Sequence, residues 1–242
     1  MKITFIGSSH GVPEPNRKCS SILIEIGASS YCIDMGTQSI EGLVTRNIPV
    51  ESVKAVFITH MHGDHTDGLI SFLDLCSWYY KNAEPIIYLP DSVNDTVSAI
   101  HAWHKCTEGS KLRDFDFRPV NRGLMYEDEN IKVTSFRTYH TKRSFAYLIE
   151  AEGKRVLFTG DLSQPQNDFP KSVLEKPLNL AVCECAHFSA MDYLQIFSGC
   201  ENLKNICFTH YTEANLQTIK NLKNSLPNKN ITVATDDMEI NI

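Results

Sequence analysis

Residues 58–69 read ITHMHGDHTDGL, and this stretch decides the fold and most of the chemistry that the sequence predicts. It follows one apolar run and precedes another, so we expect a strand, a tight turn and then a helix, with Gly63 supplying freedom in φ. Imidazole and carboxylate groups suit zinc, manganese or iron, and zinc takes such ligands at about 2.0–2.2 Å. The pattern HxHxDH therefore predicts metal ligands at His60, His62, Asp64 and His65.

These ligand-type groups exceed what one four-coordinate metal ion requires. Two metal ions about 3.5–4 Å apart, sharing a bridging carboxylate and a water, would use all of them together with ligands from distant segments. A solvated histidine-rich turn is the alternative, and the apolar strand before the motif and Gly68 with a helix after it argue against that alternative. The motif therefore indicates a dinuclear metal centre.

Length and composition predict a single domain, residues 1–242, because 42% hydrophobic content is enough for a sizeable core. A net charge of −6 argues against a broad nucleic-acid interface. No apolar run reaches the roughly 18 residues of a membrane span, and no basic segment followed by a long apolar one opens the sequence, so we expect a cytoplasmic protein without membrane contact. The eight scattered cysteines form no CxxC pair, which indicates reduced thiols in the core.

The hydrophobic pattern predicts strands and helices in alternation, an α/β fold with sheets in the middle and helices outside. Strands are predicted at residues 2–6, 21–26, 30–34, 131–136, 145–150, 155–158, 180–184, 205–208 and 231–234. Helical spacing predicts helices at residues 69–80, 192–197 and 213–224. A capping box at Ser92 and Asp95 predicts a further helix through about Cys106.

Three of the buried-type runs end in the same way. AVFIT precedes His60, RVLFT precedes Gly160-Asp161, and NICFT precedes His210. Active sites of layered α/β folds gather at the carboxyl ends of strands, so these three ends should converge on one point.

Beyond the metal motif, the chain resembles the metallo-β-lactamase superfamily. The HxHxDH turn continues into Asp67-Gly68-Leu69. Four further segments resemble motifs of that superfamily and occur in this order along the chain. They are RTYHTKRSFAYLIE, in which an isolated histidine precedes a strand, FTGD at residues 158–161, FTHY at residues 208–211 and the closing ATDDMEINI. The resemblance covers nearly the whole chain and implies a four-layer αββα metallo-β-lactamase sandwich.

The same resemblance implies a role for each motif residue. One metal ion would be held by His60, His62 and His140, the other by Asp64, His65 and His210, and Asp161 would bridge the two. The implied cofactor is a pair of divalent transition-metal ions, with zinc the first expectation and manganese or iron the alternatives. An aspartate at position 161 in place of a cysteine argues against the classical zinc β-lactamases.

Within the superfamily, the chain is most similar to the ribonuclease Z-type phosphodiesterases. This similarity lies in the opening GSSHGVPEPNRKCSSILIE with its Asn16-Arg17 pair, in CIDMGTQ and in the strand IIYLP at residues 86–90. Ribonuclease Z grips transfer RNA with a long flexible arm, whereas residues 91–119 of this chain form a short, fairly acidic segment with a helical pattern. The similarity therefore implies a small-molecule or nucleotide phosphodiester substrate, with transfer RNA not expected.

Five residues are candidates for assisting the chemistry at the metal ions. His187, in CECAHF, is a candidate general acid for the leaving group, because histidine exchanges protons near neutral pH. Asp64 or Asp161 could guide the proton of the attacking water. Glu184 and Asp34 could orient metal-bound histidines or, for Asp34, have a structural role.

Loop residues are candidates for binding substrate. His10 lies beside Gly11 and could line the cleft, and Arg17 could bind a phosphate. Solvated surface charge is the alternative for the loop cations Arg17, Lys18, Lys142 and Arg143. His101 and His104 have i, i+3 spacing that could hold a metal ion, but we expect them on a surface helix.

The sequence as a whole predicts a dinuclear metal-dependent hydrolase, with a phosphodiesterase as the leading interpretation. A thioester or lactone hydrolase is the enzymatic alternative, since a Lewis-acid site also hydrolyses carbonyl compounds. A metal-binding module without turnover is the alternative from another class. The seven-ligand set argues against it, because four ligands close a structural site. A homodimer is possible.

Overall fold

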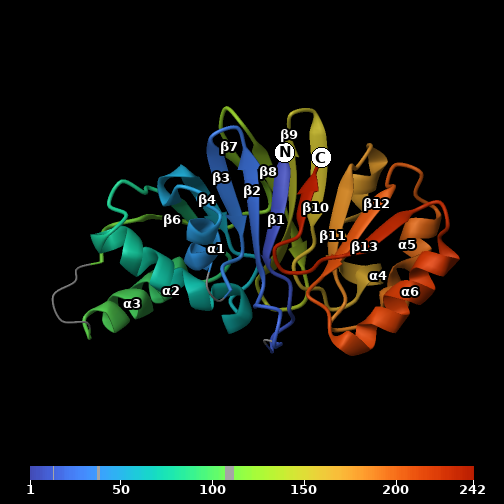
Figure 1. The fold of residues 1–242 in the computed structure, drawn as a ribbon, viewed down its shortest axis with the longest axis horizontal. Helices are drawn as coiled ribbons and strands as arrows, with labels where there is room; N and C mark the ends of the chain where they lie inside the picture. The colour runs from blue at the N-terminus through green and yellow to red at the C-terminus, as the bar shows by residue number, and fades with distance from the viewer. Residues whose placement is uncertain (13, 37–38, 107–111) are drawn as a thin grey trace.

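Two mixed β-sheets lie in the middle of the molecule, and helices cover their outer faces (Figure 1). The structure is a computed structural model that describes residues 1–12, 14–36, 39–106 and 112–242. The first sheet contains, in spatial order, β14 (Glu239–Asn241), β1 (Lys2–Gly7), β2 (Ser21–Ile26), β3 (Ser29–Ile33), β4 (Val53–Phe57), β5 (Ile86–Leu89) and β6 (Asp116–Pro119). The second contains β13 (Asn230–Val233), β12 (Asn205–Thr209), β11 (Leu180–Glu184), β10 (Lys154–Phe158), β9 (Ser144–Ala151), β8 (Lys132–Thr138) and β7 (Gly123–Glu127).

The outer layers are helical and complete the predicted four-layer αββα sandwich. The first sheet is covered by α1 (Ser39–Thr45), α2 (Gly63–Trp78) and α3 (Val93–His104), and the second by α4 (Pro165–Asp168), α5 (Leu194–Ser198) and α6 (Leu216–Ser225) (Figure 1). Short 3₁₀ turns occur at η1 (Val50–Ser52), η2 (Lys171–Glu175), η3 (Ala190–Tyr193) and η4 (Glu213–Asn215). The fold prediction is therefore confirmed.

Side-chain alternation explains why the layers stack in this order. In β2, Ile22, Ile24 and Ile26 belong to the apolar core between the two sheets, whereas Leu23 belongs to the core under the first set of helices, with Phe72 of α2. Neighbouring residues of a strand point to opposite faces, so a strand that is apolar at nearly every position must be covered on both faces. A third core fills the space between the second sheet and its helices.

All the predicted strands and helices are present, with boundaries shifted by a few residues, except that α2 begins six residues earlier than predicted. Because Gly63 is the first residue of α2, Asp64 and His65 lie in the first helical turn and not in a tight turn. Gly63 does not need a positive φ, which the structure shows only for Gly27, Gly123, Gly153 and Gly160 among the described glycines.

The sequence did not predict α1, α4, β6 and β7, and residues 91–119 are not wholly helical because β6 closes that segment. Three segments interpreted above include residues that lie outside the described ranges. These residues are 13 in the opening loop, 37–38 in CIDMGTQ and 107–111 in the segment 91–119. The prediction of a capping box at Ser92 and Asp95 was wrong, because neither of its two side-chain-to-backbone bonds is present. The Ser92 hydroxyl hydrogen-bonds the Asp95 carboxylate, and the backbone N–H of Ser92 donates to Asp91 Oδ1 at 2.9 Å.

The prediction for His104 was wrong. The residue is 3% exposed, and its Nε2 lies 3.1 Å from Oδ1 of Asp74 in α2. Helical spacing places His104 at the end of α3, but it does not reveal that this end of the helix packs on α2. His104 therefore belongs to the interface between two helices.

The remaining expectations concern cysteines and membranes. Every cysteine except Cys106 is buried, in agreement with the predicted positions in the core. None of the helices within the described ranges is long and apolar enough to cross a lipid bilayer.

Candidate metal centre

The first group of ligand-type side chains forms where the two sheets meet. His60 follows β4, His62 precedes α2, and His140 lies in the turn between β8 and β9. His62 Nδ1 lies 2.9 Å from His60 Nε2 and 3.2 Å from His140 Nε2. These three side chains and Asp161 each offer an atom within 4.8 Å of the others.

The second group consists of Asp64, His65 and His210. Asp64 Oδ2 lies 3.1 Å from His210 Nε2 and 3.2 Å from His65 Nε2, and these two nitrogens are 3.3 Å apart. His210 has a φ of +47°, a left-handed conformation that costs free energy for a residue with a side chain. Its backbone N–H donates to Ser8 O at 3.0 Å, which ties the strained residue to the loop after β1.

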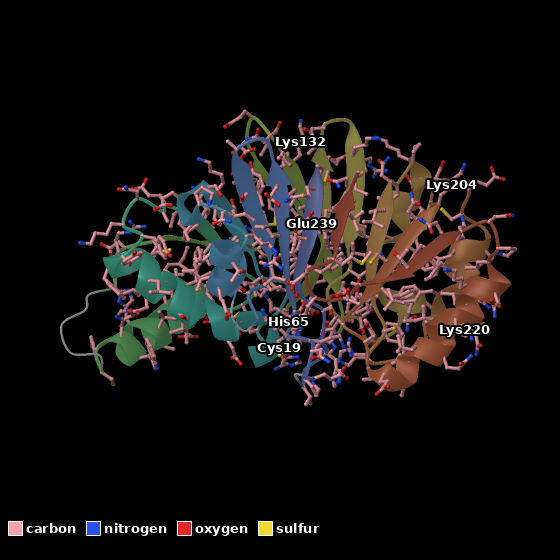
Figure 2. The ribbon with its side chains drawn as sticks, viewed as in Figure 1. Cys19, His65, Lys132, Lys204, Lys220 and Glu239 are labelled. Atoms are coloured by element: carbon pink, nitrogen blue, oxygen red, sulfur yellow. The ribbon has the colours of Figure 1, made fainter. Side chains whose placement is uncertain are left out.

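Asp161 lies between the two groups and directs one oxygen to each. Its Oδ2 is 3.6 Å from His60 Nε2 and from His140 Nε2, whereas its Oδ1 is 3.5 Å from His65 Nε2 and from His210 Nδ1. Figure 2 shows the position of His65 at one end of the sheets, opposite the end where Lys132 lies. The structure therefore brings together all seven residues that the resemblance implied as ligands, and their binding of metal stays a prediction.

The donor set fits a pair of divalent metal ions. Within the described part of the chain, Asp161 Oδ1 and His210 Nδ1 are buried without a hydrogen-bond partner. Buried polar atoms nearly always have partners, so an orphaned carboxylate oxygen beside an orphaned imidazole nitrogen indicates an ion as the partner. Imidazole with carboxylate is the donor chemistry of zinc, manganese and iron, which is why these residues fit such a pair.

Asp34 and Thr59 hold ligands of both groups. The Asp34 carboxylate accepts hydrogen bonds from Nδ1 of His65 at 2.7 Å, from Thr59 N at 2.7 Å and from Thr59 Oγ1 at 2.9 Å. Thr59 Oγ1 in turn lies 3.1 Å from His60 Nδ1. A hydrogen bond at Nδ1 leaves Nε2 as the nitrogen that can bind a metal ion.

Glu184 holds His187 beside Asp161. Its Oε1 lies 2.9 Å from His187 Nδ1, and His187 Nε2 lies 3.8 Å from Asp161 Oδ2. The backbone N–H groups of Leu162 and Ala186 donate to the same carboxylate. The hydrogen bond that His187 donates to Glu184 raises the pKa of His187, and burial raises the pKa of Glu184. His187 thus belongs to the cluster and is anchored with its Nε2 on the side of Asp161.

Burial and neighbouring charges set the protonation of the cluster. Burial lowers the pKa of His60 to about 2 and that of His140 to about 4, so both rings are neutral near pH 7. Burial opposes the charge of His65, but the carboxylates of Asp161 and Asp34 outweigh it and raise the pKa of that ring. Burial likewise opposes ionisation of Asp64 and Asp161, and the surrounding histidines lower both pKa values. Neutral imidazoles and ionised carboxylates are the forms that bind metal ions, so His60 and His140 already have the required form, whereas His65 would release a proton when a metal ion binds.

The loop that contains His10 lies against the second group. A Cβ atom added to Gly11 would lie 3.6 Å from Asp64 Oδ2, so the backbone next to His10 approaches the cluster closely. Arg17 fastens this loop, because its guanidinium donates to Glu14, to Ser8 O at 3.4 Å and to Tyr211 O at 2.9 Å, and covers the Tyr211 ring.

The donors of Arg17 therefore serve the fold, in contrast with the phosphate contact expected for it, and substrate binding by Arg17 or His10 stays a prediction. Arg143 donates to Pro90 O at 2.8 Å and is likewise engaged within the protein. Lys142, in the same turn, is exposed.

The sequence reading missed Thr59, although the signal was there. A threonine ends each of the three strand runs, as Thr59, Thr159 and Thr209. Thr159 Oγ1 accepts a hydrogen bond from Glu184 N at 3.3 Å, so two of the three threonines contact a carboxylate residue that supports the cluster. The three strand ends do converge, as predicted.

Comparison with known proteins gives one family and several relatives. The family model described as anti-Pycsar protein Apyc1 matches residues 1–225. Ribonuclease Z of Gloeothece citriformis (strain PCC 7424) is 33% identical over 152 residues, which are 62% of this chain and 46% of that protein. The chain spans about half the length of the curated relatives that it matches.

Solved structures show the same fold at low sequence identity. The short form of human tRNase Z superposes with a TM-score of 0.77 at 19% identity, covering 100% of this chain and 99% of that one. A diphosphatase from the PhnP family gives a TM-score of 0.73 at 17% identity, covering 100% and 97%. The family model spans nearly the whole chain, and the two sheets with their helices match the fold of these solved structures. The chain therefore belongs to the family described as anti-Pycsar protein Apyc1, in the ribonuclease Z-like branch of the metallo-β-lactamase superfamily.

Proposed function

We propose that this protein is a dinuclear metal-dependent phosphodiesterase that acts on a nucleotide-type phosphodiester. The arrangement of Asp161 supports the proposal most directly, because its two oxygens face two separate groups of donors at 3.5–3.6 Å. His60, His62 and His140 would hold one ion, and Asp64, His65 and His210 the other, with Asp161 shared. When bound, the ions would lower the pKa of a water molecule and neutralise charge on the phosphoryl oxygens.

On the leaving-group side, His187 is the proton donor. Its Nε2 faces Asp161, its ring is 36% exposed, and Glu184 holds Nδ1 at 2.9 Å. A histidine anchored at one nitrogen and open at the other can deliver a proton to a departing oxygen without reorienting. Glu184 is therefore a positioning residue, since it acts through His187.

On the attacking side, Asp64 receives the proton of the water nucleophile. The Asp64 side chain is 13% exposed, and its Oδ2 lies within 3.2 Å of two histidine nitrogens, which hold the carboxylate in place. The backbone at Gly11 lies close to this oxygen, so the loop with His10 covers the same side of the site. The proton donor His187 lies beside Asp161 Oδ2, whereas Asp64 contacts His65 and His210, the two histidines nearest to Asp161 Oδ1.

The phosphodiester assignment rests on the opening loop and on the relatives. The Asn16-Arg17 segment resembles the corresponding loop of ribonuclease Z-type enzymes, and the curated relatives are named ribonuclease Z. Those names favour transfer RNA as a second candidate substrate, against the expectation drawn from residues 91–119. We retain the small nucleotide-type phosphodiester as the first candidate, because that segment is short and carries no excess of basic residues, with five acidic and four basic side chains.

Two other functions remain as alternatives. A thioesterase or lactonase would use the same ions to polarise a carbonyl oxygen. A metal-binding module without turnover would have no use for His187, which Glu184 holds next to Asp161. The anchored histidine therefore favours a hydrolase over a module.

The deciding experiment is a substrate panel on protein loaded with zinc, manganese or iron. The panel contains bis(p-nitrophenyl) phosphate, 3′,5′-cyclic nucleotides, a precursor transfer RNA, an acyl thioester and a lactone, each scored by kcat/KM. Phosphodiesters should lead the panel. A higher kcat/KM for the thioester or the lactone would show that the protein is a thioester or lactone hydrolase instead. The absence of any turnover by metal-loaded protein would favour the metal-binding module without catalytic activity. Sedimentation velocity on the same samples tests whether the protein forms a homodimer.

A further inference from the structure

The turn between β8 and β9 is held rigidly beside the metal centre. The guanidinium of Arg137 donates to the carbonyl oxygens of Ser144 at 2.9 Å and of Thr141 at 3.2 Å, and also to those of Thr138 and Lys142. One side chain thus satisfies four carbonyl groups of a single turn. Backbone satisfied in this way has little freedom to move, so the side chains of the turn have fixed starting points.

Tyr139 is the exposed aromatic residue of this turn. It is 65% exposed, although both of its neighbours belong to the site. Thr138 is buried and donates through Oγ1 to the backbone oxygen of Asp161 at 3.4 Å, and His140 Nε2 lies 3.2 Å from His62. The backbone N–H of Tyr139 donates to Asp168 Oδ2 at 3.2 Å, and Asp168 is itself buried.

A cation lies over one face of the Tyr139 ring. The guanidinium carbon of Arg137 is 5.8 Å from the ring centroid, within the range of a cation–π contact. Because the four carbonyl contacts already fix that guanidinium, the ring has a stable support on one side. An aromatic ring supported on one face and exposed elsewhere loses little conformational entropy when a planar group stacks on its open face.

We infer that Tyr139 stacks on the base of the substrate and makes the enzyme prefer nucleoside phosphodiesters over phosphodiesters without a base. This inference rests on the proposed phosphodiesterase activity. Tyr139 directly precedes the candidate ligand His140, so the exposed ring belongs to the same turn as one of the donors of the metal centre. Base–aromatic stacking lost by truncation to alanine corresponds to roughly a 10-fold to 100-fold loss of affinity.

The test compares two substrates with the same leaving group. Thymidine 5′-(p-nitrophenyl phosphate) carries a base, and methyl p-nitrophenyl phosphate does not. For Tyr139→Ala we expect the ratio of the two kcat/KM values to fall roughly 10-fold to 100-fold, while Tyr139→Phe keeps the ratio of the wild type, because phenylalanine keeps the ring. Metal content and circular dichroism confirm that the neighbouring ligand His140 is undisturbed.

Tyr79 supplies the matched control. It is 64% exposed, nearly the same as Tyr139, and lies at the carboxyl end of α2 after Trp78. Tyr79→Ala should leave the substrate ratio unchanged. An equal fall in the Tyr79 and Tyr139 variants would mean that the effect is not specific to the turn and would overturn the inference.

A binding measurement separates this inference from the proposed function. Isothermal titration of thymidine 5′-monophosphate into metal-loaded protein needs no turnover. Weaker binding by Tyr139→Ala but not by Tyr139→Phe supports stacking even if neither p-nitrophenyl substrate is cleaved, in which case only the phosphodiesterase proposal fails. Equal affinity in wild type and Tyr139→Ala, or no binding by the wild type, overturns the role of Tyr139.

Discussion

His65 donates a 2.7 Å hydrogen bond from Nδ1 to Oδ2 of Asp34, which precedes it by 31 positions in the chain. The same carboxylate accepts from the Thr59 hydroxyl, and that hydroxyl lies 3.1 Å from His60. One buried carboxylate at the end of β3 thus positions a ligand in each of the two donor groups. The two metal subsites should therefore respond together to a change at Asp34.

Replacing Asp34 by Asn tests this shared support. Asn has the same shape and tolerates the φ of +59° at this position, but its amide cannot accept every hydrogen bond that the carboxylate accepts. We expect Asp34→Asn to weaken metal binding by about 10–100-fold. Competition with a chromophoric zinc chelator measures the affinity. Asp67→Asn, at an exposed position in the same motif, is the control, and equal affinities in the two variants would contradict the role of Asp34.

Asp161→Ala should remove the one ligand that both metal ions share. Without a common carboxylate the two cations repel each other, so we expect the metal content to fall from two ions per chain to one or none and nearly all turnover to be lost. The sheets do not depend on this side chain, so the far-ultraviolet circular dichroism should stay unchanged. Elemental analysis gives the stoichiometry. Two retained metal ions with near-normal rates would show that Asp161 does not bridge.

His187→Asn should distinguish substrates by their leaving groups. A cyclic nucleotide leaves as an alkoxide that needs a proton, whereas p-nitrophenolate departs without one. We expect kcat on a 3′,5′-cyclic nucleotide to fall by about 10²–10⁴-fold and kcat on bis(p-nitrophenyl) phosphate to fall much less. Glu184→Gln, which changes the partner of His187 but leaves the imidazole, should show a smaller effect of the same kind. Equal losses on both substrates would argue against proton donation.

His104→Ala should reduce stability without changing the metal centre. His104 is 3% exposed and faces Asp74, so its removal leaves a cavity between α2 and α3 and takes a partner from a carboxylate. We expect the free energy of unfolding to fall by about 1–3 kcal/mol, measured by urea titration, with unchanged metal content. His101→Ala, one turn earlier and less buried, is the control and should cost less. Loss of metal ions from the His104 variant would mean that the ligand set is misassigned.

Asp128 should link stability to acid pH. Its Oδ2 accepts from the hydroxyls of Tyr31 at 2.6 Å and Tyr126 at 2.7 Å, and its Oδ1 accepts from two backbone N–H groups. Burial opposes ionisation, but these hydrogen bonds outweigh it and lower the pKa of Asp128. A lowered pKa stabilises the folded protein above the ordinary value near 4, and this stability is lost as the pH falls through the folded value.

The variant Asp128→Asn cannot ionise at this position, so it lacks that pH-dependent stability. We expect the difference in free energy of unfolding between wild type and Asp128→Asn to be largest at neutral pH and to shrink below pH of about 4. Urea titrations at several pH values measure it. A difference that is constant across this pH range would show that the charge of Asp128 does not contribute.

The sequence by itself determined the layer pattern and named the candidate ligands that the structure brings together. Strands that are apolar at nearly every position, such as AVFIT and NICFT, require cover on both faces, which agrees with sheets in the middle and helices outside, whereas the four-layer αββα sandwich was implied by the resemblance. Ligands that directly follow such runs, such as His60 and His210, must lie at the carboxyl ends of strands. Both features are local in sequence, so pattern and resemblance were sufficient to place them.

Only the tertiary structure decided which polar side chains are free to act. Arg17 lies in a loop where the sequence allows a solvent-exposed or substrate-binding position, but its guanidinium donates a hydrogen bond to Tyr211 O, 194 positions later in the chain. His104 is buried because the end of α3 packs against Asp74 of α2. Tyr139 is exposed on a turn whose carbonyl groups are bound by Arg137, and the Arg137 guanidinium lies 5.8 Å from the centre of the Tyr139 ring. Burial and hydrogen bonding depend on which distant surfaces meet, and the free energy of that pairing is not contained in any short stretch of sequence.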